Sequence, residues 1–203
     1  MGLKSVVLAT GNPHKRDEIR QILADTPVEI LSLADLRVTL DVTEDGESYT
    51  DNALIKARAA HLATGMAAIA DDSGIEVDAL GGAPGIRSAR FAGDDSTDEE
   101  NNLLLLSQMK DLSETERIAR FVCAAVLVFS EERGMKKEIV CTGEWHGTIG
   151  FQPKGRYGFG YDPLFVIPEE KATAAELGKT YKREHSHRSK AFRALAEYLK
   201  AFD

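Results

Sequence analysis

The sequence predicts an α/β protein, because strand-like apolar runs alternate along the chain with helical patterns that carry capping signals. The apolar run 5–10 is followed by Asn12 and Pro13, which suit the N-cap and the first turn of a helix. A second helix is predicted over 48–64, and it leads directly into the apolar run 67–70. Strands and helices in alternation are typical of a sheet covered by helices.

The composition fits a single globular domain over residues 1–203, with room for two lobes. Hydrophobic residues make up 43% of the chain and charged residues 29%, which is enough apolar material for a core. No apolar run approaches the roughly 20 residues of a membrane span, so we expect no membrane partner. The first apolar run is also too short for a secretory signal.

The cysteines and the net charge narrow the class of protein further. Cys123 and Cys141 fall in predicted strands, and we expect buried free thiols in a reducing, cytoplasmic compartment. The formal net charge is −8, whereas a nucleic-acid-binding face is usually basic. We therefore expect no nucleic-acid partner, although a small anion needs only a local positive pocket.

An acidic pair, Asp71 and Asp72, follows the apolar run 67–70 and precedes Ser73 and Gly74. We expect the pair where the strand 67–70 ends, because ligands collect at strand ends in α/β sheets. Neighbouring carboxylates repel each other, and a metal ion or a cationic partner relieves that cost. The alternative is a plain acidic turn, since Asp, Ser and Gly are common turn residues.

The segment Thr10, Gly11, Asn12, Pro13, His14, Lys15 opens the first helix with cations in its first turn. Cations there oppose the helix dipole unless an anion lies between them. Free backbone N–H groups at the same end also favour an anion. This pattern predicts a phosphate site, although the Walker A spacing is absent. The alternative is an ordinary strand-to-helix turn with a solvated basic end.

Further polar groups occur in four other segments. An acidic loop over 41–47 contains Glu44, and Asn52 and Lys56 share a face of the following helix; by default Lys56 is a surface lysine. The loop Phe159, Gly160, Tyr161, Asp162 interleaves glycines with aromatic rings that suit stacking on a base, although tucked aromatics in a hairpin loop give the same pattern. The segment 179–188 is predicted as a loop rich in donors, including Lys182, His187 and Arg188.

The remaining elements follow from periodicity and capping signals. A helix is predicted over 97–109, a short helix after the capping box Thr173 to Glu176, and a final amphipathic helix. A hairpin turn is predicted at 131–134. Strands are predicted at 28–31, 75–77, 119–129, 137–149 and 164–167, and the last helix carries an apolar stripe of Phe192, Leu195, Leu199 and Phe202.

Together these segments supply what phosphoryl chemistry needs: positioning, charge neutralisation and an activated water. The basic groups can hold a polyphosphate, and Asp71, Asp72 and Glu44 can hold a divalent cation against it. Phe159 and Tyr161 can stack a base, and His187 and Arg188 can donate to an oxo group. This interpretation requires the side chains of Lys15, Lys56 and Lys182 to converge beside Asp72.

Six short motifs in order resemble the inosine triphosphate pyrophosphatase family, which includes the bacterial XTP/dITP diphosphatases. The likeness extends from Thr10 to Arg188, nearly the whole chain, and the six motifs in one order are highly specific. The motifs are Thr10-Gly11-Asn12-x-x-Lys15, Asn52-Ala53-x-x-Lys56-Ala57, Ala70-Asp71-Asp72-Ser73-Gly74, Leu80-Gly81-Gly82-Ala83-Pro84-Gly85, Phe159-Gly160-Tyr161-Asp162-Pro163 and Ser186-His187-Arg188.

The resemblance implies a long mixed β-sheet with flanking helices, in two lobes with a central substrate cleft. It implies Mg²⁺-dependent hydrolysis of ITP, dITP and XTP to the monophosphate plus pyrophosphate, by a homodimer. Asp72 is implied as general base and metal ligand, with Glu44 as the other metal ligand and Asp45 as its rival. The segment from Thr10 to Lys15 is implied to bind phosphates. The other implied substrate contacts are Ser73, Phe159, Gly160, Tyr161, Asp162, Lys182, His187 and Arg188, and the basic side chain of Lys56 is expected to hold the polyphosphate.

Elementary chemistry agrees with the implied substrates. An Arg or His donor matches the 6-oxo group of hypoxanthine and mismatches the 6-amino group of adenine, because a buried donor facing a donor is costly. Two other functions remain open at this point. One is a pyrophosphatase for other modified nucleotides, and the other is a nucleotide sensor without turnover.

Overall fold

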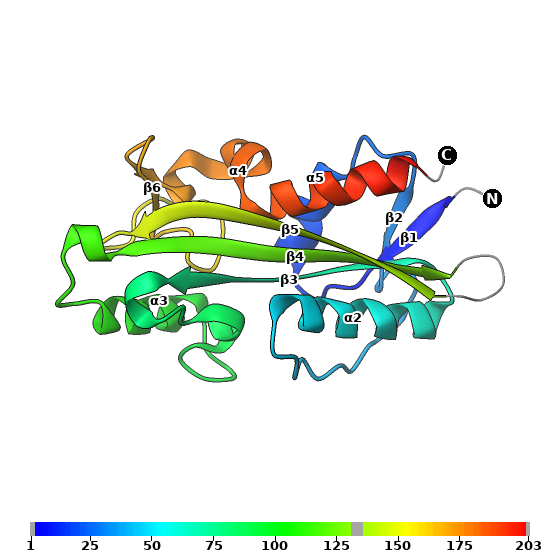
Figure 1. The fold of residues 1–203 in the computed structure, drawn as a ribbon, viewed down its shortest axis with the longest axis horizontal. Coiled ribbons are helices and arrows are strands. Elements are labelled where there is room, and N and C mark those ends of the chain that lie inside the picture. The colour runs from blue at the N-terminus through cyan, green and yellow to red at the C-terminus, as the bar shows by residue number, and fades with distance from the viewer. Residues whose placement is uncertain (1–2, 131–135, 202–203) are drawn as a thin grey trace. The chain divides into compact units, whose positions relative to one another are not determined.

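A computed structural model describes residues 3–130 and 136–201 (Figure 1). The strands described form one mixed sheet in the order β2-β1-β3-β4-β5-β6-β7. They are β1 (Ser5–Leu8), β2 (Glu29–Ser32), β3 (Ala68–Val77), β4 (Ile118–Ser130), β5 (Lys136–Ile149), β6 (Phe165–Ile167) and β7 (Ala172–Thr173). The helices are α1 (Pro13–Ile22), α2 (Tyr49–Thr64), α3 (Asp98–Gln108), α4 (Ala174–His185) and α5 (His187–Lys200), with short 3₁₀ segments η1 (Asp78–Leu80), η2 (Gly85–Arg90) and η3 (Glu114–Glu116).

The chain divides into two compact units. Unit 1 comprises Met1–Asp72, Cys123–Gly143 and Arg188–Asp203, and unit 2 comprises Ser73–Val122 and Glu144–His187. The chain passes from one unit to the other within β3, within β4, within β5 and at the start of α5. The interpretation of residues 1–203 as one domain stays a prediction.

In unit 1, β1 pairs in parallel with β2 and with β3. Side chains alternate across β1, because successive residues of a strand face opposite sides. Val6 and Leu8 belong to one core, packed with α1 and α5, whereas Val7 and Ala9 belong to another, packed with α2. Figure 1 shows α5 and α2 on opposite faces of the strands.

Several sequence predictions for unit 1 are confirmed. The stripe residues Phe192, Leu195 and Leu199 are fully buried, whereas Phe202 lies outside the described residues. Cys123 and Cys141 are buried free thiols. Ser48 caps α2 and Gly65 ends it in the left-handed conformation, as the composition of that segment predicts.

Unit 2 has its own core. It contains Phe121 and Trp145 from the long strands, Leu105 from α3, Phe165 from β6 and Ala174 from α4. Capping boxes begin both of these helices, Thr97 with Glu100 and Thr173 with Glu176. The predicted hairpin turn at 131–134 lies outside the described residues.

The structure corrects two sequence predictions. The strand predicted to end before Asp71 instead continues as β3 through Gly74 to Val77. Asp, Ser and Gly are poor strand formers, but pairing within a sheet overrides such preferences. The acidic pair nevertheless lies just beyond the point where β1 stops, since the last β1 partners are Leu8 and Ile69.

The second correction concerns the loop predicted over 179–188. Residues 179–185 are helical, as part of α4, and α5 begins at His187. Gly178 has φ 80° and ψ −173°, so the helix is interrupted there and then resumes. A glycine adopts this backbone without steric cost, and the kink explains why the sequence reads as the end of a helix. Among the residues that the structure describes, no helix combines the length and the hydropathy needed to cross a membrane.

Candidate active site

The turn between β1 and α1 is fixed by its own side chains. The Asn12 Oδ1 atom accepts hydrogen bonds from the backbone N–H groups of His14 (2.9 Å) and Lys15 (3.1 Å), and the Asn12 N–H group donates to Thr10 Oγ1 (3.2 Å). The first turn of α1 holds no acidic residue. Because the cap occupies two of the N–H groups, an anion here meets chiefly the basic side chains and the helix dipole.

Asp71 is buried among cations of unit 1. Its Oδ2 atom lies 3.1 Å from Lys15 Nζ and 3.3 Å from Arg188 Nε, and the Arg188 Nη1 atom lies 2.6 Å from Glu18 Oε2. The Asp71 side chain is 0% exposed. Burial lowers the pKa of Arg188, but the charges of Asp71 and Glu18 outweigh burial and leave that pKa above its ordinary value. Asp71 therefore anchors two cations.

Asp72 and Glu44 share the ammonium group of Lys56. The Lys56 Nζ atom lies 2.8 Å from Glu44 Oε2 and 3.6 Å from Asp72 Oδ1. Asn52, one helical turn before Lys56 on α2, donates from Nδ2 to Asp72 Oδ2 (3.2 Å) and accepts at Oδ1 from the Gly46 N–H group (2.9 Å). The predicted shared face of Asn52 and Lys56 is thus the face that meets the acidic groups.

Burial and neighbouring charge shift the pKa values in this cluster. Burial raises the pKa of Asp72, and the opposing charges of Lys56 and Lys15 do not fully offset it, so the pKa stays above its ordinary value. Burial lowers the pKa of Lys56, but Asp72, Asp71 and Glu44 together raise it above its ordinary value. A carboxylate with a raised pKa is a stronger base toward water.

The carboxylates of unit 1 fit a hard divalent cation. Within the described part of the chain, no group of three or more His, Cys, Asp and Glu side chains is placed to hold a metal ion. Mg²⁺, however, is commonly bound by one or two carboxylates together with substrate phosphates and water. Glu44 and Asp72 supply two such groups, and their side chains are 35% and 11% exposed. Asp45 is exposed, and the contact with Lys56 favours Glu44.

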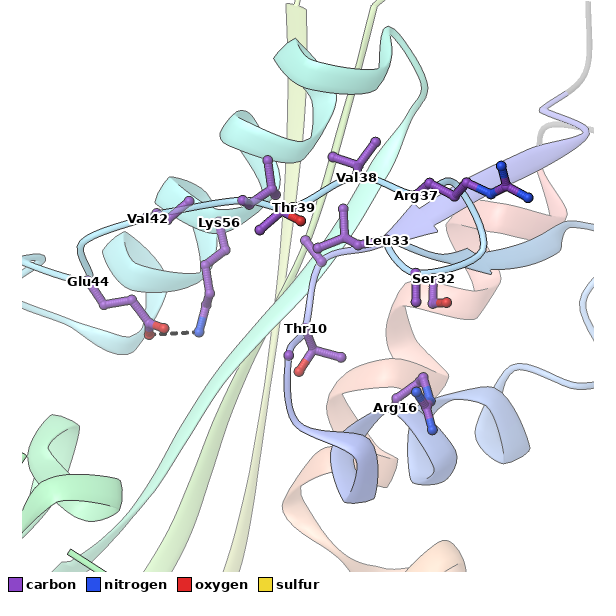
Figure 2. A pocket seen from close by; sticks show the side chains of 14 residues that line it. Thr10, Arg16, Ser32, Leu33, Arg37, Val38, Thr39, Val42, Glu44 and Lys56 are labelled. Carbon is purple, nitrogen blue, oxygen red and sulfur yellow. Dashed lines mark hydrogen bonds and ion pairs between the residues drawn. The ribbon is translucent and has the colours of Figure 1, made fainter. Parts of the chain in front are cut away.

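A cavity of about 540 Å³ lies in unit 1 beside this cluster. Thr10, Gly11, Glu44 and Lys56 line it, and Figure 2 shows Glu44 and Lys56 joined on one side with Thr10 opposite. The carboxyl ends of β1 and β2 open into it, as expected for a ligand site in a parallel sheet. The other lining residues are Ala9, Arg16, Ser32, Leu33, Ala34, Arg37, Val38, Thr39, Leu40 and Val42.

The sequence did not single out the segment 32–42 as a wall of this cavity. Ser32 and Asp35 bond to each other's backbone and side-chain groups, which shapes a short turn. Arg37 follows in the left-handed conformation, with φ 55°. The Ser-x-x-Asp spacing at 32–35 is the one sequence signal for that turn.

In unit 2, the Asp162 side chain holds together the loop Phe159, Gly160, Tyr161, Asp162. Its Oδ2 atom accepts from Lys182 Nζ (2.6 Å) and from the Phe159 N–H group (2.9 Å), and both side chains of the ion pair are almost fully buried. The Lys182 ammonium group also lies 4.7 Å from the centre of the Phe159 ring. At Gly158, where φ is 84°, an added Cβ atom would clash with the Asp162 carboxylate, so the position favours glycine.

Helix α3 holds the same loop from the other side. The Gly160 N–H group donates to Asp98 Oδ2 (2.6 Å), and Asn102 Nδ2 donates to the Gly160 carbonyl (3.0 Å). Asp98 and Asn102 are four residues apart on α3, so one face of the helix binds both the N–H and the carbonyl group of Gly160. Neither residue was identified from the sequence, because the contact is nonlocal.

The two aromatic residues of this loop differ in exposure. Tyr161 is 4% exposed, and its hydroxyl donates to the Ser88 carbonyl (2.8 Å). Burial raises the pKa of Tyr161, with a smaller contribution from Asp98. Phe159 is only half-buried. This difference favours Phe159 as the ring that meets a ligand.

The remaining predicted residues lie where the chain passes between units. Ser73, half-buried, follows Asp72 on β3, and His187 precedes Arg188 at the start of α5. His187 is 3% exposed and stacks on Phe121. The structure brings Lys15 and Lys56 to the acidic pair in unit 1, whereas Lys182 pairs with Asp162 in unit 2.

The fold and the site define a mixed-sheet α/β protein with buried carboxylates and cations clustered beyond the ends of its parallel strands. The chain belongs to the Ham1 family, whose family model matches residues 6–198. The family resemblance and the long mixed sheet with flanking helices, both predicted from the sequence, are confirmed. The two lobes with a central cleft stay a prediction.

Similar proteins cover nearly the whole chain. A dITP/XTP pyrophosphatase of Vibrio parahaemolyticus is 46% identical over 199 residues, which is 98% of both chains. The structure of a HAM1 protein from Coxiella burnetii matches with a TM-score of 0.87 and 37% identity, over 98% of this chain and 99% of the other. A protein of Mycobacterium abscessus, described as a nucleoside-triphosphatase and dITP/XTP pyrophosphatase, matches with a TM-score of 0.74 and 42% identity, over 96% and 98%.

Proposed function

We propose that this chain hydrolyses the deaminated purine nucleoside triphosphates ITP, dITP and XTP to the monophosphate and pyrophosphate, with Mg²⁺. The observation that carries the proposal is the 46% identity, over nearly the full length, to a relative named dITP/XTP pyrophosphatase. The carboxylate and lysine cluster of unit 1 supports it, because phosphoryl transfer needs positioning and charge neutralisation.

The basic groups of unit 1 hold the triphosphate. The segment from Thr10 to Lys15 and the side chain of Lys56 supply cationic and hydroxyl groups at the carboxyl end of β1. Glu44 and Asp72 would hold Mg²⁺ beside them. When bound, the metal neutralises phosphate charge and acidifies water.

Asp72 accepts the proton of the attacking water. Asn52 donates to one carboxylate oxygen and Lys56 lies nearest the other, so the orientation of the carboxylate is fixed. Its raised pKa makes Asp72 a better base than an exposed aspartate. Asp71 pairs with Lys15 and Arg188 and holds them in place.

The purine base is recognised by residues that stack on its ring and by residues that donate hydrogen bonds to it. Phe159, held by Lys182 and by the loop through Gly160, Tyr161 and Asp162, stacks on the purine. His187 and Arg188 donate to the 6-oxo group, and Ser73 and Lys182 contact the substrate. A 6-amino group facing these donors leaves them unpaired, which disfavours adenine nucleotides.

Chromatography of the products formed from ITP and Mg²⁺ tests the proposal. We expect inosine monophosphate and pyrophosphate in equal amounts, a much slower reaction with ATP, and no reaction after chelation of the metal. Inosine diphosphate with orthophosphate would reject the proposed cleavage. Tight binding of ITP without any product would instead identify a sensor, and preference for another modified nucleotide would identify a different pyrophosphatase.

The assembly and the compartment are part of the same proposal. We propose a homodimer, as the family resemblance implies, in a reducing cytoplasm that suits two buried free thiols. Sedimentation equilibrium of the purified chain tests the dimer.

A further inference from the structure

Phe121 takes no part in the proposed reaction, but its ring stacks on His187, which is proposed to contact the base. The ring centroids of Phe121 and His187 lie 4.7 Å apart, and the ring planes differ by 9°. This near-parallel geometry is that of a stacked pair. Both residues belong to unit 2 and are buried, with exposures of 7% and 3%. One face of the imidazole is therefore covered by a phenyl ring.

Phe121 is itself held in place by other rings. Along β4, Ala119 and Phe121 are buried while Ile118 is exposed and Arg120 is half-buried, so the strand directs the Phe121 side chain into the core. Its ring lies 4.6 Å from the Phe165 ring at 58°, and 6.4 Å from the Trp145 ring at 25°. Close-packed neighbours leave such a ring few alternative rotamers. Phe121 is thus a fixed platform under His187.

The platform limits how the imidazole can turn. His187 begins α5, so its backbone is fixed by the helix, and the remaining freedom is rotation of the side chain. Stacking on Phe121 restricts the plane of the ring and hence the direction of its N–H groups. Hydrogen bonds weaken steeply when the donor angle departs from linearity. The ability of His187 to distinguish a 6-oxo from a 6-amino group therefore depends on this plane.

We infer that Phe121 is a positioning residue that sets the preference for 6-oxo purines by holding the plane of the His187 imidazole. The inference rests on the proposed function, because it assigns no chemistry to Phe121 and acts only through base recognition. It concerns selectivity, so it predicts a change in the ratio between two substrates rather than a general loss of turnover.

The experiment compares kcat/KM for ITP and for ATP in variants of the full chain. Phe121→Leu and Phe121→Met both remove the flat ring and retain an apolar side chain, so one of them serves if the other folds poorly. We expect the ITP-to-ATP ratio to fall about tenfold or more in both, through a lower kcat/KM for ITP, because lost donor geometry costs only the matched substrate. Phe121→Tyr keeps the ring face and is expected to stay within about twofold of wild type.

Phe165→Leu is the matched control. Phe165 is fully buried in the same cluster and contacts Phe121 and Trp145, so the substitution imposes a similar packing loss. We expect lower stability with a much smaller fall in the substrate ratio than in Phe121→Leu, because the Phe121 ring remains under the imidazole. In a His187→Ala background, Phe121→Leu should change the ratio no further, because a residue that acts through another shows no separate effect.

The outcomes separate this inference from the proposed function. If wild type releases no pyrophosphate from ITP, the proposed function is wrong and the inference fails with it. If wild type prefers ITP but both ring-deletion variants keep the wild-type ratio, the inference alone is overturned. It is also overturned if Phe165→Leu lowers the ratio as much, or if Phe121→Leu has an undiminished effect beside His187→Ala.

Discussion

At the scale of single residues, the two adjacent aspartates have different surroundings. Asp71 is paired with Lys15 and Arg188 and is fully buried, whereas Asp72 is bonded by Asn52 and faces Lys56. We predict that Asp72→Asn folds normally but loses turnover of ITP by about 10³-fold, the usual magnitude for a general base. Steady-state kinetics with a melting curve measures both quantities.

Asp71→Asn provides the comparison. A neutral amide leaves two cations without their carboxylate, so we expect a loss of about 2 kcal/mol or more in unfolding free energy. Urea denaturation at neutral pH measures it. Near-normal turnover of Asp72→Asn, or equal stability of the two variants, would contradict these separate roles.

Lys15 is predicted to act mainly in binding. Lys15→Ala removes a cation beside Asp71 at the start of α1, and we expect a KM for ITP raised about tenfold with a smaller change in kcat. Arg58→Ala is the control, because its guanidinium lies 2.7 Å from Glu138 and is not part of the cavity lining. Equal effects of the two substitutions on KM would contradict a specific phosphate contact by Lys15.

At the scale of elements, Arg117 joins the end of α3 to the end of β5. The buried guanidinium donates to the carbonyls of Met109 (2.7 Å), Ile149 (2.7 Å) and Gly150 (2.9 Å). We predict that Arg117→Met lowers the unfolding free energy by about 3 kcal/mol, because the carbonyls lose a charged donor. Arg120→Met is the control, since that side chain is 42% exposed beside Glu76, and urea denaturation should show a change below about 1 kcal/mol.

The turn at 32–37 gives a pH-dependent prediction. Hydrogen bonds from Ser32 and from Arg20 lower the pKa of Asp35 from its ordinary 3.8 to about 2. A lowered carboxyl pKa contributes stability that is present above pH 3.8 and is lost as the pH falls through about 2. We therefore expect wild type to be more stable than Asp35→Asn at pH 5, with most of that difference gone at pH 2, in urea titrations at both values. A gap that widens toward acid pH would show that the pKa is not lowered.

Local chemistry made some elements predictable and left others hidden. Asn12, Ser48, Thr97 and Thr173 cap helices through neighbouring backbone groups, so their roles can be read from adjacent residues. The passage of β3 through Asp71 to Gly74 depends on neighbouring strands, and no local signal reveals it.

The same distinction holds for the candidate site. Its charged residues could be identified from their type and spacing, and Lys15 and Lys56 do contact the acidic pair. The residues that position other parts of the site could not be identified in this way. Glu18, Asp98 and Asn102 act through contacts with residues far along the chain. Tyr161, predicted to present a flat face, is instead buried in the core of unit 2, where its hydroxyl donates to the Ser88 carbonyl.

At the scale of the whole molecule, the net charge of −8 opposes an anionic substrate, so binding draws on the local cations and, under the proposed function, on a metal. A ligand that binds the folded state alone raises stability by an amount set by its concentration and dissociation constant. Asp72→Asn allows this to be measured with ITP itself, since turnover is expected to be slow. With Mg²⁺ absent, the phosphates meet Lys15 and Lys56 without a neutralising cation on Glu44, and binding is expected to weaken.

We predict that ITP with Mg²⁺, at about 100 times its dissociation constant, stabilises Asp72→Asn by about 2.7 kcal/mol. Differential scanning calorimetry, with the dissociation constant taken from isothermal titration on the same variant, checks the value. ATP at the same concentration should stabilise less, because the donors His187 and Arg188 mismatch a 6-amino group. ITP without Mg²⁺ should also stabilise less. Equal stabilisation by ITP and ATP would show that binding depends on the triphosphate and not on the base. Discrimination between the two bases would then occur in the chemical step.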